Sequence, residues 1–128
     1  MPRKKKSGDN KNYYFGNEQE KAVVDYKFSA NPEERNHIYK TFLEKPFNIM
    51  ADAIFGMYHA KNRKCDDDER VSIQYTAISH LVEQMVKFDP TRITKKGEPA
   101  KAYSYCQTIV RNFYKDIDKR LHKEKIQI

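Results

Sequence analysis

The sequence predicts an all-α protein that folds as a compact helical bundle of four or five helices. Apolar residues recur every three or four positions over long stretches, which places them on one side of an α-helix. The 128 residues include only 4 glycines and 5 prolines, so few positions interrupt these patterns. Hydrophobic residues make up 38% of the chain and charged residues 34%, which suits one modest core in a single domain.

The first segment, residues 1–12, is rich in lysine and arginine and contains a single acidic residue, Asp9. This composition predicts a disordered basic arm. Such an arm strengthens binding to any polyanion, and a role in solubility alone is the alternative. The predicted helical domain covers residues 13–125.

The first helices are expected at residues 17–28 and from residue 31 onward. Asn17 followed by Glu20 resembles a capping box, and an Asn-Pro step opens the second helix. The aromatic residues 13–15 are expected to pack against the start of the first helix, with base stacking as the alternative. Pro46 is expected to break or kink the second helix, which then restarts.

The charged segment 61–70 is expected to be a loop that leads into a helix from about Glu69 to Lys87. Its acidic residues fit the start of that helix. A metal site is not expected there, because their spacing with His59 and Cys65 matches no zinc or calcium pattern. The residues of this helix expected to face inward are Val71, Tyr75, Ile78, Val82, Met85 and Val86. Those expected on its solvent side are Ile73, Ala77, His80, Gln84 and Lys87.

The last and longest helix is expected to begin just after Pro99, at about Lys101, and to run to about Lys125. Its apolar side is expected to bury Cys106 in the reduced form. The opposite side is cationic with an aromatic ring near its start, which suits melted DNA or RNA. A solvated lysine-rich surface is the alternative. The candidate nucleic-acid-binding residues are Tyr105, Thr108, Arg111, Asn112, Lys115, Lys119 and Lys123.

The net charge of +7 and the pI near 9.3 favour nucleic acid or an anionic membrane as the partner. No apolar run is long enough to span a bilayer. Of the two polyanionic partners, nucleic acid is expected and a membrane is not. With only two cysteines, no disulfide framework is expected, and a reducing cytosol is favoured. The sequence contains no nucleophile elbow, phosphate-binding glycine loop or zinc motif, so we expect a binding protein with no enzymatic activity and no cofactor.

Three segments carry a resemblance to a known family. Residues 78–90 resemble the helix in region 2 of the sigma-70 family that ends in a Phe-Asp pair. Residues 102–120 are similar to the promoter-reading helix of that region, and residues 14–27 resemble the start of the late-promoter sigma factors of T-even-type phages. The order and spacing of the three segments agree with those phage factors.

The resemblance implies a sigma region 2-like domain that acts in transcription initiation in the cytoplasm of an infected bacterial host. Such a factor binds core RNA polymerase, directs it to an AT-rich promoter element and has no activity of its own. The helix from Val71 to Lys87 then docks on the clamp helices of the largest polymerase subunit. The implied polymerase-binding residues are Ile73, Ala77, His80 and Gln84.

By the same resemblance, the last helix faces the non-template strand of promoter DNA. Tyr105 then stacks on a base, and Arg111, Lys115 and Lys119 hold phosphates. A phage co-activator is a further partner that the resemblance allows. No helix-turn-helix domain and no acidic polymerase-binding tail are expected after Leu121.

The alternative function is a helical accessory protein. It would bind nucleic acid non-specifically, or modify polymerase without recognising promoters. An exposed Ile73 and Ala77 would favour a protein partner, because plain DNA binders need no apolar docking surface.

Overall fold

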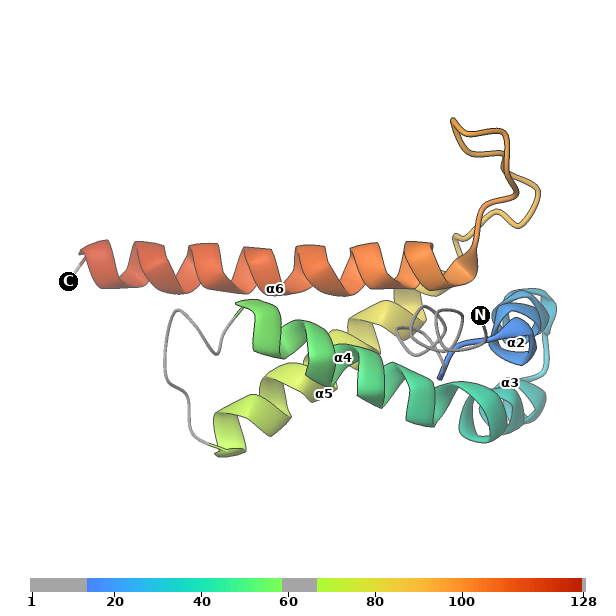
Figure 1. Cartoon of the computed structure of the whole chain (residues 1–128). Coiled ribbons are helices and arrows are strands. Elements are labelled where there is room, and N and C mark those ends of the chain that lie inside the picture. Colours follow the sequence, from blue (N-terminus) through green and yellow to red (C-terminus); the bar gives the residue numbers. More distant parts are fainter. Residues whose placement is uncertain (1–13, 59–66, 128) are drawn as a thin grey trace, which may run out of the picture.

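The computed structural model of the chain describes residues 14–58 and 67–127 (Figure 1). The predicted basic arm at residues 1–12, together with His59 and Cys65, lies outside this part. The described elements are α2 (Asn17–Phe28), α3 (Pro32–Ile38), the π-helical η1 (Tyr39–Leu43), α4 (Glu44–Tyr58), α5 (Asp67–Met85) and α6 (Ala102–Gln127). The all-α prediction is confirmed, since the described residues contain an isolated β-bridge but no strand.

The long helix α6 lies across α4 and α5, and α2 and α3 lie near the end where α6 begins (Figure 1). The core fills the space between these helices, so one side of α6 is buried and the other faces solvent. The largest fully buried side chains are Tyr114, Phe47, Leu43, Met50, Leu81, Met85, Val23, Val110 and Cys106.

The first helix begins one residue earlier than the capping-box pattern at Asn17 indicates. Gly16 is the N-cap, and its backbone N–H donates to Gln19 Oε1 over 2.9 Å. Phe15 is 4% exposed, and its ring lies 6.4 Å from the ring of Phe47. Phe15 therefore packs against α4, and the expected packing against the start of its own helix stays a prediction.

Glu20, which the sequence pattern places in a cap of its own helix, instead caps α6. Its two carboxylate oxygens accept hydrogen bonds from the backbone N–H groups of Ala102, at 2.7 Å, and Tyr103, at 3.0 Å. A negative charge at a helix N-terminus also interacts favourably with the helix dipole. This contact fixes the start of α6 against α2.

Replacing Glu20 with alanine is therefore expected to lower the free energy of unfolding by about 1.5–3 kcal/mol, the range for charge-assisted hydrogen bonds. Urea denaturation measures this change. Glu18→Ala is the matched control, because Glu18 lies in the same first turn of α2 and is exposed. Equal destabilisation by the two variants would contradict the capping role of Glu20.

Pro46 was expected to break or kink the helix, and the structure shows no break at this position. It lies in the first turn of α4, directly after the five π-helical residues of η1. Proline has no N–H to donate to the carbonyl of Phe42, four residues earlier. Gln19 Nε2 from α2 donates to this carbonyl instead, over 3.2 Å. The wider turn of η1 and this side-chain partner allow the helical run to continue through the proline.

The orientation of α5 differs in part from the prediction: Ile78 and Met85 are buried as predicted, but two other residues of the inward set are not. Ala77 and Leu81 are fully buried, whereas Val71 is 67% exposed and Tyr75 is 72% exposed. The sequence of α5 has apolar residues on two sides, and periodicity alone does not show which side packs into the core. Ile73, predicted to face solvent, is partly buried and packs against the core.

The core side of α6 follows a spacing of four residues. Ala102, Cys106, Val110 and Tyr114 have no exposed surface, and the Tyr114 hydroxyl donates to the carbonyl of Ala51 over 2.9 Å. Burial, followed by the nearby Glu20 charge, raises the pKa of Cys106 to about 12. The Cys106 thiol is free and buried, as the sequence predicted, and the raised pKa favours its protonated form.

Candidate nucleic-acid interface

The connection between α5 and α6 forms a short hairpin, residues 92–100, where the sequence predicted only a polar loop. The Thr94 N–H donates to the Glu98 carbonyl over 2.8 Å, and the Ala100 N–H donates to the Arg92 carbonyl over 2.9 Å. Gly97 turns the chain at the tip with a φ of 82°, a conformation that favours glycine. The Lys-Lys-Gly run before Glu98 was the available turn signal in the sequence.

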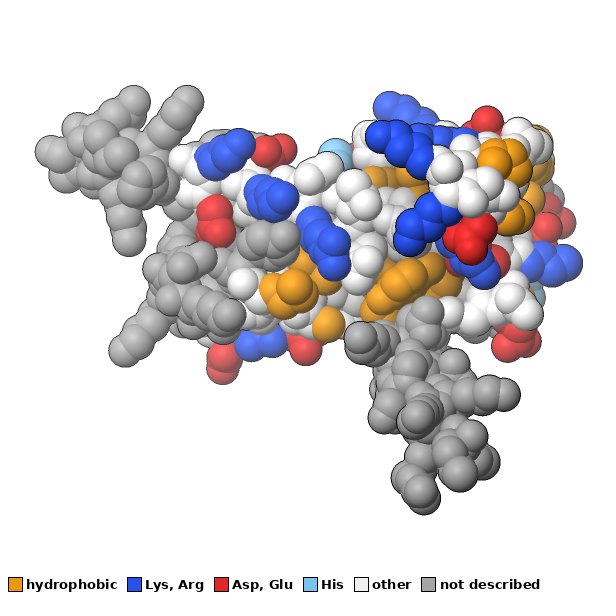
Figure 2. Space-filling view, turned by 45° about the horizontal axis from the view of Figure 1, so that its top comes forward, with side chains coloured by type: hydrophobic (Ala, Val, Ile, Leu, Met, Phe, Trp, Pro, Cys, Tyr) orange, Lys and Arg blue, Asp and Glu red, His pale blue; other side chains and the backbone are white. Residues whose placement is uncertain are grey.

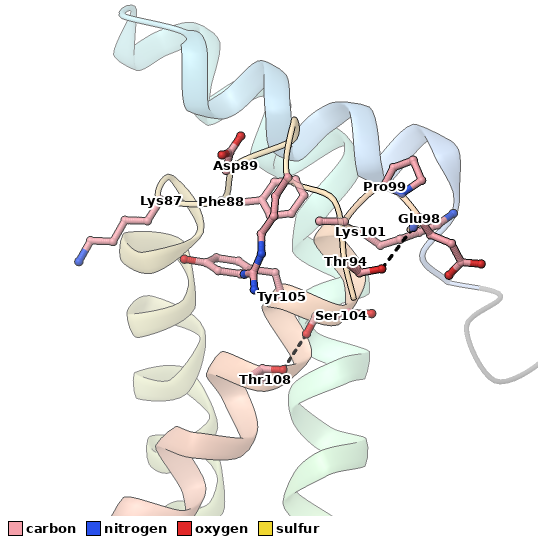
Figure 3. A pocket seen from close by; sticks show the side chains of 12 residues that line it. Lys87, Phe88, Asp89, Thr94, Glu98, Pro99, Lys101, Ser104, Tyr105 and Thr108 are labelled. Atoms are coloured by element: carbon pink, nitrogen blue, oxygen red, sulfur yellow. Dashed lines mark hydrogen bonds between the residues drawn. The ribbon is translucent and has the colours of Figure 1, made fainter. Parts of the chain in front are cut away.

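A groove of about 700 Å³ lies between this hairpin, the end of α5 and the first turns of α6 (Figure 3). Ligand-binding pockets in proteins commonly span about 300–1,000 Å³. The groove is therefore large enough for a nucleobase with its sugar. It is lined by Lys87, Phe88, Asp89, Arg92, Thr94, Glu98, Pro99, Ala100, Lys101, Ser104, Tyr105 and Thr108.

Two aromatic rings form one wall of the groove. The Tyr105 ring centroid lies 5.4 Å from that of Phe88, with the two planes at 50° (Figure 3). Phe88 is 4% exposed and belongs to the core, whereas Tyr105 is half-buried. The sequence predicted Tyr105 on the fully solvated side of α6, but the structure does not place it there. It lies at the edge of that side, where Phe88 restricts the movement of its ring.

The charged side chains around the groove are three cations, Lys87, Arg92 and Lys101, and two acids, Asp89 and Glu98. The Asp89 carboxylate accepts hydrogen bonds from the Thr91 hydroxyl, at 2.6 Å, and the Thr91 N–H, at 2.9 Å. These bonds lower the pKa of Asp89 and hold its charge in the turn after α5. The lining therefore carries a net positive charge.

The solvent side of α6 continues from the groove along the helix. Thr108, Asn112, Lys115 and Lys119 are exposed and recur at spacings of four, three and four, so they share one side. Figure 2 shows Lys and Arg side chains along α6 and over the hairpin, with some acidic residues between them. The structure thus brings these predicted residues together, and it does not describe the side chain of Lys123.

Arg111 lies beside this row and is half-buried. Its Nε atom is buried and has no hydrogen-bond partner among the described residues. This Nε atom has almost no exposed surface, so it does not itself reach a phosphate in solvent, and Arg111 adds positive charge beside the row through its half-buried side chain.

The four predicted polymerase-binding residues do not form a solvent-facing patch. Ala77 is fully buried, and Ile73 packs against the core. Gln84 and His80 are half-buried, and the His80 ring lies 5.4 Å from the ring of Phe113 on α6. The prediction that Ile73 and Ala77 face solvent was therefore wrong, because α5 turns this side toward the other helices.

The solvent side of α5 instead presents Val71 and Tyr75, one helical turn apart. On the neighbouring α4, Asp52 pairs with Arg70 and accepts a hydrogen bond from Gln74 Nε2 at 3.0 Å. The hydrogen bonds from Arg70 and Gln74 lower the pKa of Asp52. The first turn of α5 is acidic, so this surface differs in charge from the cationic side of α6.

Comparison of the chain with protein-family models, curated proteins and solved structures found no match. Within residues 14–58 and 67–127, no three metal-ligating side chains are grouped so that they could hold an ion. None of the helices in that part has the length and apolar character needed to cross a membrane.

Proposed function

We propose that the protein is a transcription initiation factor of the sigma region 2 type, which binds one DNA strand along α6 and core RNA polymerase through α5. It directs the polymerase to an AT-rich promoter element and has no catalytic activity of its own. The observation that carries this proposal is the continuity between the cationic side of α6 and the groove beside Tyr105.

The length of the cationic side suits several nucleotides. Thr108 and Lys119 are eleven residues apart, which corresponds to about 16 Å of helix at 1.5 Å per residue. A strand that keeps its helical stacking advances about 3.4 Å per nucleotide, so at most about five phosphates can lie along this side. Lys115 and Lys119 then contact phosphates on successive helical turns, with Arg111 beside them.

The groove suits a base that has left the stack. Extruding a base from a duplex costs a few kcal/mol, and stacking on an aromatic side chain returns about 1–3 kcal/mol. Tyr105 is positioned against Phe88 before any ligand binds, so little side-chain freedom is lost on stacking. Ser104 and Thr108 supply polar groups beside the ring, although the Thr108 hydroxyl already donates to the Ser104 carbonyl over 2.9 Å (Figure 3).

The solvent side of α5 suits a protein partner. Val71 and Tyr75 are large and exposed on a helix that packs against α4 and α6. Tyrosine is one of the residues most often found at the energetic centre of protein interfaces. Nucleic acid is disfavoured on this side, because the acidic first turn of α5 repels phosphates. This surface replaces the docking residues that the sequence indicated.

The proposal is tested by retention of bacterial core RNA polymerase on the immobilised chain, followed by run-off transcription from templates with an AT-rich promoter element. We expect the chain to retain the core enzyme and to be required for promoter-specific transcripts. Failure to retain polymerase, with equal affinity for all DNA sequences, would instead support the non-specific accessory protein. Retention without promoter-specific transcripts would support a modifier of polymerase.

A further inference from the structure

The hairpin at residues 92–100 projects from the bundle beside the start of α6 (Figure 1). We propose that this hairpin enters a groove of double-stranded DNA that adjoins the strand held on α6. The inference rests on the proposed function for the position of that single strand. It adds a second DNA-binding site with a different ligand, duplex DNA.

The hairpin has a defined shape before it meets a ligand. Besides the two hydrogen bonds between its arms, the Gly97 N–H donates to the Thr94 carbonyl over 2.9 Å and closes the tip. Ile93 and Pro99 form the antiparallel bridge between the arms. The missing N–H of Pro99 is tolerated because the hydrogen bonds come from the flanking residues.

The size of the hairpin fits the major groove. An extended strand rises about 3.3 Å per residue, so the arm from Arg92 to Lys95 spans about 10 Å. The major groove of B-DNA is about 12 Å wide and 8.5 Å deep, and it admits a two-stranded β-ribbon. The tip can therefore reach the base edges while the stem remains at the level of the phosphates.

The side chains of the hairpin suit that position. Lys95 and Lys96 are exposed at the tip, and Arg92 extends the positive charge along the stem, opposed only by Glu98 within the hairpin. Ile93 is 60% exposed, so the hairpin also presents an apolar side chain. Cations can pair with phosphates on either side of the groove, and apolar side chains contact thymine methyl groups there.

The composition of the hairpin disfavours a single strand as its ligand. Single-strand binders stack bases on aromatic rings, and residues 91–99 contain no aromatic side chain. The rings lie instead at the base of the hairpin, where Phe88 and Tyr105 line the groove. The two sites adjoin, which places duplex DNA at the hairpin and the unpaired strand at α6.

The first test measures the salt dependence of DNA binding by the chain alone, without polymerase. For the variant Lys95→Ala/Lys96→Ala, the magnitude of the negative slope of log K against log salt is expected to decrease by about two on a blunt duplex. On a single strand of the same length the slope should not change. The control Lys40→Ala/Lys45→Ala removes the same charge from exposed positions in η1 and α4 and should leave both slopes unchanged.

The second test keeps the charge of the hairpin and changes its shape. Gly97→Val forces a β-branched residue into a φ of 82°, so the tip should deform while both tip lysines remain. We expect this variant to lose duplex affinity and to keep single-strand affinity, with unchanged helicity. Equal losses on both DNA forms, or no loss on duplex, would overturn the proposal. Because no polymerase or promoter is used, this outcome is independent of the test of the proposed function.

Discussion

The double variant Val71→Glu/Tyr75→Glu is expected to lose retention by core RNA polymerase while the helical bundle stays folded. Both side chains are more than half exposed, at 67% and 72%, so new charges there remain in water. If they form the centre of the interface, removing them costs at least about 2 kcal/mol each, and a glutamate adds an unpaired buried charge. Retention on the immobilised variant measures this loss directly.

A second variant separates this effect from unfolding. Ala77→Glu places a charge at a position with no exposed surface, so it should lower the midpoint of thermal unfolding sharply. The Val71→Glu/Tyr75→Glu variant should unfold at nearly the wild-type temperature. If it unfolds as early as Ala77→Glu, or if it still retains polymerase, the assignment of the solvent side of α5 to polymerase is contradicted.

Removal of Lys115 and Lys119 is expected to produce the second large effect. Because α6 is proposed to hold an unpaired strand, the probe is a single strand, on which each phosphate contact adds about 0.7 to the magnitude of the slope of log K against log salt. The double alanine variant should therefore reduce this magnitude by about 1.4, and a fourfold rise in salt then weakens the variant about sevenfold less than the wild type. The loss should be the same for all DNA sequences, because phosphates carry no sequence information.

Fluorescence anisotropy at several salt concentrations measures this slope. The Lys40→Ala/Lys45→Ala variant serves as a control here too, because it removes two exposed lysines from elements away from α6. An equal fall in slope for both double variants would show that only the total charge matters. The solvent side of α6 would then have no specific role in binding.

The helical class and part of the core could be predicted, because they depend on local periodicity. Cys106 and Val110 share the apolar side of a long pattern, and both are fully buried. The rotation of α5 could not be predicted in the same way. Its sequence places Val71 and Tyr75 on one apolar side and Ala77 and Leu81 on another, and only contacts with distant helices decide between the two sides.

The groove also depends on contacts between residues that are far apart in the sequence. Glu20 fixes the start of α6 from 82 residues away, a partner that no local capping pattern reveals. Phe88, which lies outside α6, contacts the Tyr105 ring. The sequence could therefore predict Tyr105 as an aromatic residue on the cationic side of α6, but it could not predict that the ring is half-buried and lines the groove. The residue types identified the candidate binding residues, and the tertiary contacts determined which of these residues are exposed to solvent.

The central claim is that the groove beside Tyr105 binds an unpaired base, and the most direct test compares two DNA templates. For polymerase bound to the chain, Tyr105→Ala is expected to lose about 1–3 kcal/mol on a fork that exposes an unpaired base. The same variant should lose little on fully paired DNA, and Tyr105→Phe should bind both templates like the wild type because it keeps the ring. An equal loss on fork and duplex for Tyr105→Ala would contradict the claim, because Tyr105 would then serve only to pack against Phe88.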